Sequence, residues 1–248
     1  MGQCIAVVSG KGGTGKTSFT AGVSQALALS GQRVLCLDCD IGLRNLDLAL
    51  GLTDRALMDF SDVAQGRCSL ESAVVEHPRI PNLFLLTAPV RIRGRSVTAE
   101  EMAALLDAVR EQYDFCLLDA PAGLGMGFQL ATAAADRAVV VTTADASSLR
   151  DAQHTVMELN RFRTGTLHLV VNRVRKKLLR SMHATIDDAI DKAGLPLIGV
   201  VPEDDALPLS LNRGTPLLLS DGQSPSASAY RNIAVRLQGG KRPLLRIR

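Results

Sequence analysis

The chain has 248 residues, of which 46% are hydrophobic, so it is long enough to bury a sizeable core as a single α/β domain. Its 28 basic and 25 acidic side chains leave a formal net charge of +3, too small for a surface that coats nucleic acid by charge alone. No apolar run approaches the roughly 18 to 20 residues that span a bilayer, and the start of the chain lacks the basic region and cleavage site of a secretion signal. We therefore expect a cytoplasmic protein, or at most one that associates with a membrane peripherally.

Short apolar runs alternate with amphipathic stretches along the chain. The predicted strands, many of them nearly continuously apolar, are residues 3–9, 33–38, 83–86, 115–119, 137–142, 167–172 and 197–201. Residues 17–30, 98–112, 147–161 and 185–193 have helical spacing, and Gly31 and Gly194 follow two of them as stop signals. Thr98 and Glu101 have the spacing of a capping box. This order predicts an α/β fold with a doubly wound, mostly parallel sheet, helices on both faces and ligands at the carboxyl ends of the strands.

One domain is expected over residues 1–240, followed by a short basic and apolar tail, KRPLLRIR, at residues 241–248. The loop-like segment DGQSPSAS, residues 221–228, leads into a last helix that ends near Gln238. Five cysteines, an odd number, fit reduced thiols better than a disulfide framework. We interpret Cys36 and Cys39, which have C-x-x-C spacing, as core packing rather than as a metal or redox site.

The segment from Gly10 to Thr17 has the Gly-x-x-x-x-Gly-Lys-Thr spacing of a phosphate-binding loop, and it lies between a predicted strand and a predicted helix. Glycines let backbone amides turn toward phosphates, and the helix N-terminus adds its positive end. We expect Lys16 to reach the β and γ oxygens of ATP and the Thr17 hydroxyl to ligate Mg²⁺. The predicted nucleotide-binding residues of this loop are Gly10, Lys11, Gly12, Gly13, Thr14, Gly15, Lys16, Thr17 and Ser18.

A second lysine, Lys11, lies on the limb of the loop next to the strand. If two such loops faced each other, Lys11 would reach the partner's γ-phosphate as an arginine finger does; the alternative is a solvated loop lysine, and charge chemistry alone leaves both open. KGGTGKT resembles the deviant Walker A motif of the MinD/ParA family of ATPases, which are P-loop NTPases of the SIMIBI type. In that family the early lysine acts across an ATP-sandwiched dimer. The resemblance therefore implies an ATP-dependent homodimer and a catalytic role in trans for Lys11.

Asp38 and Asp40 follow the second predicted strand, at the sheet edge where the phosphates are expected. Carboxylates there hold Mg²⁺ through its waters or orient a water for attack on the γ-phosphate, although two acids at a strand end are also common turn formers. Beside the phosphate loop, we assign Asp40 to catalysis through the attacking water and, together with Asp38, to the metal shell. The segment DIGLRNLD resembles the MinD branch of the family rather than the ParA branch. The match implies that Asn45 lies near the nucleotide and the dimer interface.

Asp119 ends the apolar run FCLLD and has the position of a Walker B acid, which binds a water of the metal. Gly123 follows in DAPAG and is able to present its amide to the γ-phosphate, although a capped strand-to-helix turn has the same sequence signals. Gly125 stands where many members of the MinD branch carry Glu. The resemblance therefore leaves the dimer contacts of this segment undetermined.

The residues at the ends of two predicted strands late in the chain are predicted to recognise the adenine base of ATP. Asn172 and Arg173 resemble the family's adenine-side residues, and an Asn amide matches a donor and an acceptor on adenine. Pro202, Glu203 and Asp204 resemble the loop that covers the base. Without the resemblance, both segments read as ordinary strand-end turns.

The segments GLTDRALMDFSDVAQGRCSLESAVV, ASSLRDAQ and GVVPEDDALPLSLNRGTP also follow the order and spacing of the MinD branch, so the resemblance covers almost the whole chain. It implies a Mg²⁺-dependent ATPase whose ATP-bound dimer binds the membrane peripherally and regulates placement of the division septum. It also implies a MinC-like inhibitor and a MinE-like activator as partners, on a surface that includes Arg150 and Asp151.

Two basic segments leave rival interpretations open. The tail offers Leu244, Leu245 and Ile247 among cations, which suits weak binding to anionic lipid, but Pro243 interrupts a helix and a disordered basic tail is equally consistent. Residues 173–177 with Arg180 form either a solvated face or a non-specific DNA patch, as in a ParA-like DNA partition ATPase. A flagellar-number regulator is a third interpretation, from a relative that usually carries an N-terminal extension.

Overall fold

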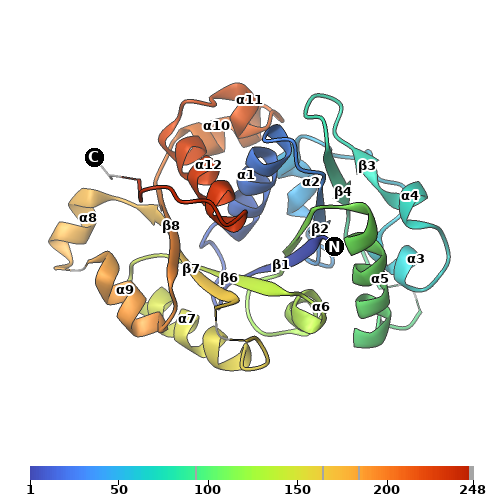
Figure 1. The fold of residues 1–248 in the computed structure, drawn as a ribbon, viewed down its shortest axis with the longest axis horizontal. Helices are drawn as coiled ribbons and strands as arrows, with labels where there is room; N and C mark the ends of the chain where they lie inside the picture. Colours follow the sequence, from blue (N-terminus) through green and yellow to red (C-terminus); the bar gives the residue numbers. More distant parts are fainter. Residues whose placement is uncertain (93, 164, 184, 246–248) are drawn as a thin grey trace.

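The computed structural model describes residues 1–92, 94–163, 165–183 and 185–245, which form one eight-stranded sheet between two layers of helices (Figure 1). The strand order is β3-β4-β2-β5-β1-β6-β7-β8, and every neighbouring pair is parallel except β3 with β4. The strands are β1 (Gln3–Val8), β2 (Val34–Asp38), β3 (Val75–Glu76), β4 (Leu83–Leu86), β5 (Phe115–Asp119), β6 (Arg137–Thr142), β7 (Leu167–Val174) and β8 (Leu197–Pro202). The predicted doubly wound, mostly parallel sheet is confirmed.

Helices fill the connections between the strands. They are α1 (Lys16–Leu29), α2 (Asn45–Leu50), α3 (Phe60–Ala64), α4 (Leu70–Ala73), α5 (Ala99–Gln112), α6 (Met126–Ala133), α7 (Ala146–Glu158), α8 (Lys176–Ser181), α9 (Ile186–Ala193), α10 (Ala206–Asn212), α11 (Leu217–Ser220) and α12 (Pro225–Leu237). Thr98 begins α5 with the predicted capping box, in which its hydroxyl accepts from the backbone N–H of Glu101. Gly194 ends α9 in the left-handed conformation that glycine adopts without strain.

The sheet divides the buried side chains into two clusters, one on each face. Cys4, Ala6 and Val8 of β1 belong to the cluster that also contains buried residues of α5, α6, α7 and α9. Ile5 and Val7 belong to the cluster that contains buried residues of α1, α2, α11 and α12. Figure 1 shows these two sets of helices on opposite sides of the sheet. Because both faces of β1 are buried from Cys4 to Val8, its sequence is a continuous apolar run over these residues.

The C-x-x-C pair is split between these clusters. Cys36 packs in the cluster with α1, and Cys39 packs in the cluster with α5. Both thiols are free and fully buried, and burial raises the pKa of Cys36 to about 12. The two cysteines are therefore packing residues that belong to opposite faces of the sheet.

The structure differs from the sequence prediction in its shortest elements. Helix α12 begins at Pro225, inside the segment predicted as a loop, because Ser224 caps it and proline suits a first helical turn, where its missing N–H has no helical partner. The two-residue strand β3 has no recognisable periodicity. The last helix was predicted, and only its start differs. The helices that were not predicted are four to eight residues long: α2, α3, α4, α6, α8, α10 and α11.

The tail lies against the body of the protein as far as Leu245. Residues 241–245 form neither helix nor strand, and Arg236 of α12 donates from Nε and Nη2 to the Arg242 carbonyl oxygen at 3.1 and 2.7 Å. Leu245 packs against the cluster that contains α12. Arg246, Ile247 and Arg248 lie outside the described residues. Within the described ranges, no helix combines the length and the apolar character needed to cross a bilayer.

The contact between α1 and α12 requires glycine at position 22. A Cβ at Gly22 would lie 2.2 Å from Cδ2 of Tyr230, a fully buried ring. We expect Gly22→Ala to lower the free energy of unfolding by about 1 to 3 kcal/mol, because the two helices must separate to accept the methyl group. Urea denaturation measures the change. Gly125→Ala is the matched control, since a Cβ there meets no atom within 4 Å, and equal losses in the two variants would contradict the close packing.

Candidate functional site

The phosphate loop, residues 9–15, connects β1 to α1 at the carboxyl edge of the sheet. Gly15 has a φ of 86°, a left-handed value that favours glycine, and a Cβ there would lie 2.4 Å from the side-chain nitrogen of Asn172. A Cβ on Gly10 would lie 2.4 Å from the carbonyl oxygen of Asp151 in α7. Other elements therefore pack directly against the loop backbone at both of its ends. The exposed predicted residues of the loop are Lys11, Gly12 and Gly13, and Thr14 is buried.

Two side chains at the end of β7 hold this loop. Asn172 donates from Nδ2 to the Thr14 carbonyl at 2.8 Å, and Arg173 donates from Nη1 to the Gly13 carbonyl at 3.0 Å. Glu203, directly after Pro202 at the end of β8, accepts from Nε and Nη2 of Arg173 at 2.9 and 3.1 Å. The two strand ends predicted to recognise a base thus contact each other, and one of them contacts the phosphate loop.

Lys16 is the first residue of α1, and its side chain is buried. Burial lowers the pKa of Lys16, while the carboxylates of Asp119 and Asp40 act in the opposite direction. Ser18 follows in the first turn of the helix and is half-buried. A buried ammonium beside the N-terminus of a helix is a favourable environment for an anionic group.

Asp119, the last residue of β5, is held by two threonines of α1. Thr17 donates its hydroxyl to Oδ2 of Asp119 at 2.6 Å, and Thr20 donates to Oδ1 at 3.1 Å. Burial raises the pKa of Asp119 to about 6, although the hydrogen bond from Thr17 and the charge of Lys16 lower it. The contact between Thr17 and Asp119 joins the first turn of α1, directly after the phosphate loop, to the predicted Walker B acid.

A second buried acid lies beside it. Asp38, the last residue of β2, is in register with Asp119 on the neighbouring strand, and its carboxylate accepts from the backbone N–H of Asp40 at 2.8 Å and of Leu46 at 3.3 Å. Burial and the neighbouring Asp119 raise the pKa of Asp38 to about 7. Burial also raises the pKa of Asp40, against the charge of Lys16. A cation close to these acids would favour their ionised forms.

The donor atoms at this edge suit Mg²⁺, because hydroxyl and carboxylate oxygens are its preferred protein ligands. Throughout the described residues, no three His, Cys, Asp or Glu side chains gather to hold a metal ion on their own. A magnesium ion here would therefore take few protein oxygens and complete its shell with water and phosphate, as it commonly does. The buried Thr14 hydroxyl lacks a hydrogen-bond partner within the described ranges, which fits a loop that receives a polar ligand.

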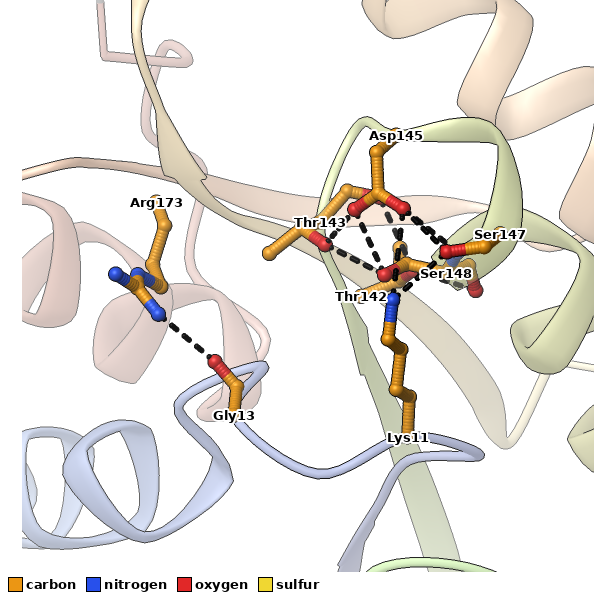
Figure 2. A network of polar contacts seen from close by, with 8 residues as sticks. All are labelled: Lys11, Gly13, Thr142, Thr143, Asp145, Ser147, Ser148 and Arg173. Atoms are coloured by element: carbon orange, nitrogen blue, oxygen red, sulfur yellow. Dashed lines mark hydrogen bonds and ion pairs between the residues drawn. The ribbon is translucent and has the colours of Figure 1, made fainter.

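Lys11 extends from the loop to the start of α7, as Figure 2 shows. Its Nζ donates to Oγ of Ser147 at 2.7 Å and lies 3.8 Å from Oδ1 of Asp145. Although burial acts to raise it, hydrogen bonds from Thr143, Ser147 and Ser148 hold the pKa of Asp145 well below its usual range. In this structure Lys11 therefore has an ionised partner within its own chain.

Three predicted site residues have surroundings that the sequence did not suggest. Asn45 is the exposed first residue of α2, on the connection that follows β2. The Gly123 amide donates to the Ser9 carbonyl at 3.2 Å, so it would have to leave Ser9 to meet a phosphate. The Asp204 carboxylate accepts from the N–H and hydroxyl of Ser226 at 2.9 and 2.6 Å, and a nucleotide contact through this group would compete with those bonds.

Sequence reasoning did not identify Thr20, Asp145 or Ser147 as site residues. The spacing of Thr20 carried a signal, because a residue three positions after Thr17 lies on the same helix face. No sequence pattern pointed to Asp145 or Ser147, because only the packing of α7 beside the phosphate loop brings them to Lys11.

Comparisons of the sequence and of the structure with known proteins find members of the same protein family. Residues 5–217 match the family model described as the CobQ/CobB/MinD/ParA nucleotide binding domain. A septum site-determining protein MinD from Synechocystis sp. is 39% identical over 246 residues, which are 99% of this chain and 92% of that protein. A chain from the MinC:MinD cell division protein complex of Aquifex aeolicus superposes with a TM-score of 0.90 at 36% identity and covers 98% of each chain. MinD of Pyrococcus horikoshii in complex with Mg-ADP gives a TM-score of 0.82 at 30% identity, with 96% of each chain covered.

The hydrogen bond from Thr20 to Asp119 can be tested by removing one hydroxyl. Thr20→Val should raise the Mg²⁺ concentration needed for half-maximal binding of a fluorescent ATP analogue about tenfold, because a hydrogen bond to a charged group contributes about 1.5 to 3 kcal/mol. Thr20→Ser keeps the hydroxyl and should titrate like the original chain. If the valine and serine variants gave the same Mg²⁺ dependence, Thr20 would not position Asp119.

The two buried acids predict how the stability of the metal-free chain depends on pH. The folded-state pKa values of about 7 for Asp38 and about 6 for Asp119 exceed the ordinary value of 3.8, so folding favours their protonated forms. Their contribution is complete below the ordinary pKa and is lost as the pH rises through the folded-state values. The free energy of unfolding should therefore fall between about pH 4 and pH 7, and less steeply in Asp38→Asn. Urea titrations in a chelator measure both slopes, and identical slopes would refute the assignment to Asp38.

Proposed function

The chain belongs to the CobQ/CobB/MinD/ParA family of nucleotide-binding proteins, and we propose that its nucleotide site controls the pairing of two copies of the chain. It is an ATPase of the MinD type, and it acts in determining the site of the division septum. We further propose that ATP with Mg²⁺ is the bound form that pairs two chains and that hydrolysis separates them. Because the relatives match the MinD branch over nearly the whole chain, the partition and flagellar alternatives are not favoured.

The observation that carries the proposal is the meeting of Lys16, Thr17 and Asp119 at the end of the phosphate loop. Lys16 and the loop amides would bind the β and γ oxygens of ATP, as in other phosphate loops. Thr17 and Asp119 would hold Mg²⁺ directly or through water, with Asp38 supporting the shell. Bound there, Mg²⁺ offsets negative charge on the phosphate oxygens. Asp40, which lies near enough to Lys16 to raise its pKa, would orient the attacking water.

The role of Lys11 follows from where its side chain lies in the single chain. Its ammonium contacts the start of α7 instead of the loop, and Lys11 and Asp145 are 45% and 44% exposed. An ion pair that is so accessible to water contributes only about 0 to 1 kcal/mol, so little free energy opposes its separation. We propose that Lys11 leaves Asp145 when two chains pair and contacts the γ-phosphate of the partner chain. Pairing and hydrolysis would then depend on the same cation.

The proposed partners follow from two surfaces. A MinC-like inhibitor is proposed because a chain of the MinC:MinD complex is so similar, and the exposed Arg150 with Asp151 on α7 offers a contact surface for it or for a MinE-like activator. The proposed membrane contact is the tail, in which Lys241, Arg242 and Leu244 are exposed. Pairing would double this weak anchor and increase membrane binding through avidity. The protein would then move between the cytoplasm and the cytoplasmic face of the membrane.

Substitution of the two lysines separates binding from pairing. Lys16→Ala should weaken ATP binding about 100-fold or more, because it removes the charge that meets the β and γ oxygens. Lys11→Ala should bind ATP normally but lower kcat by about 1,000-fold, the lower end of the effect of a finger residue in trans, and should remain a monomer in ATP. Size-exclusion chromatography with light scattering and phosphate release measure the two effects, and Lys192→Ala on α9 serves as the control. A Lys11→Ala chain that still pairs and hydrolyses ATP at the original rate would refute the role in trans.

A further inference from the structure

His77 lies directly after β3, and its side chain is buried. The backbone N–H groups of Arg79 and Ile80 donate to its Nδ1 at 3.1 and 2.9 Å, and its Nε2 lies 3.1 Å from the carbonyl oxygen of Leu50. Because Nδ1 accepts two hydrogen bonds, it carries no proton, and the proton of the neutral ring is on Nε2. Nε2 therefore donates to Leu50, the last residue of α2.

The surroundings of the ring favour this neutral form. Burial lowers the pKa of His77, and the charges of Arg79 and Arg55 lower it further, against the hydrogen bond to Leu50, which acts in the opposite direction. At neutral pH the ring thus keeps one nitrogen as an acceptor and the other as a donor.

The hydrogen bond to Leu50 fixes the second end of α2, and the first end is bound to the acidic edge of the sheet. Leu46, in the first turn, donates its backbone N–H to the carboxylate of Asp38 at 3.3 Å. The backbone N–H of His77 donates to the carbonyl of Leu83 in β4 at 2.8 Å, and β4 pairs with β2, which ends at Asp38. Both ends of α2 are thus hydrogen-bonded, one directly and one through His77, to the same pair of strands.

Apolar packing alone does little to fix where α2 lies along its own axis. Leu46 and Leu50 are fully buried, but hydrophobic contact has no preferred direction. The hydrogen bond from His77 to the Leu50 carbonyl has a preferred length and angle, so it resists a shift of the helix. The bond from Leu46 to Asp38 is already long at 3.3 Å, and a small shift of α2 away from Asp38 would break it.

We propose that His77 is a positioning residue of the nucleotide site: through the carbonyl of Leu50 it holds α2 so that the Leu46 N–H stays on Asp38. This role rests on the proposed function, in which Asp38 supports the shell of Mg²⁺. The N–H of Leu46 lowers the pKa of Asp38 against the effect of burial, and so favours the ionised carboxylate that a metal shell requires. His77 would therefore influence the binding of magnesium without touching it.

The first test needs neither nucleotide nor metal. In a chelator, ¹³C NMR of aspartate carboxyl carbons gives the pKa of Asp38, whose signal is identified by its loss in Asp38→Asn. His77→Leu removes both ring nitrogens and should raise this pKa by about 0.5 to 1, because the carboxylate loses the hydrogen bond from Leu46. His77→Gln places an amide donor near the position of Nε2 and should restore the original pKa. An unchanged pKa of Asp38 in His77→Leu would overturn the proposal.

The second test is the Mg²⁺ dependence of nucleotide binding at about pH 8, where His77 is neutral. His77→Leu should raise the Mg²⁺ concentration for half-maximal binding of a fluorescent ATP analogue about 3- to 10-fold, and His77→Gln should titrate like the original chain. Gly199→Ala is the control for lost stability, because a Cβ there would lie 2.3 Å from Cγ1 of Ile233, in a contact between β8 and α12. It should destabilise the fold in urea and keep the original Mg²⁺ dependence.

The results distinguish a failure of this role from a failure of the proposed function. If the original chain requires Mg²⁺ and His77→Leu titrates identically, His77 is not a positioning residue and the proposed function stands. The same conclusion follows if His77→Gln is as weak as His77→Leu, or if Gly199→Ala shows an equal loss. If the original chain binds the analogue without dependence on Mg²⁺, the proposed magnesium site is wrong, and the titration of Asp38 still decides whether His77 acts on it.

Discussion

The hydrogen bond from Thr17 to Asp119 joins the start of α1, directly after the phosphate loop, to the acidic edge of the sheet, and the rest of the site is arranged around it. Two carboxylates, Asp38 and Asp119, are buried side by side at the ends of neighbouring strands, where burial disfavours their charged forms. The single chain compensates with two threonine hydroxyls, two backbone amides and the ammonium of Lys16. This compensation is incomplete, as the raised pKa values of both acids indicate. A bound magnesium ion would complete it, so the same charges that destabilise this edge would favour a nucleotide with its metal.

The phosphate loop contacts α7 and the residue before it at two points. Both contacts matter for how a partner protein bound to α7 would influence ATP hydrolysis. Gly10 packs against the backbone of Asp151, and Lys11 reaches Asp145 and Ser147 at the start of the helix. The surface proposed for protein partners, Arg150 and Asp151, is therefore continuous with the place where Lys11 lies in the single chain. A partner that displaced the start of α7 would change the position of the loop backbone and the partners of Lys11 together. No separate pathway between the two sites is needed, because they share atoms in contact.

The basic side chains between Arg173 and Arg180 lie in two different environments. Arg173 points back to the phosphate loop and is neutralised by Glu203, whereas the cations of α8 face solvent beside the tail. One short segment thus runs from the strand end beside the phosphate loop to the groove beside the tail.

The amino-acid sequence was sufficient for most of the strands, for the longer helices and for the phosphate loop, which depend on neighbours along the chain. The alternation of apolar runs gave seven of the strands, because a strand buried on both faces must be apolar throughout, and the order of strands and helices required a parallel sheet. The spacing of Gly10, Gly15, Lys16 and Thr17 marked the phosphate loop, since its chemistry needs those residues in consecutive positions. Seven short helices and β3 were not predicted, because helices of four to eight residues complete too few turns, and a strand of two residues too few alternations, to show a clear period. Folding alone placed Thr20 and Thr17 on the two oxygens of Asp119, joined Arg173 to Glu203 and laid Lys11 on Asp145. These contacts join residues that are distant in the chain, and their partners are chosen by the way helices pack on the sheet, which no local pattern of residues encodes.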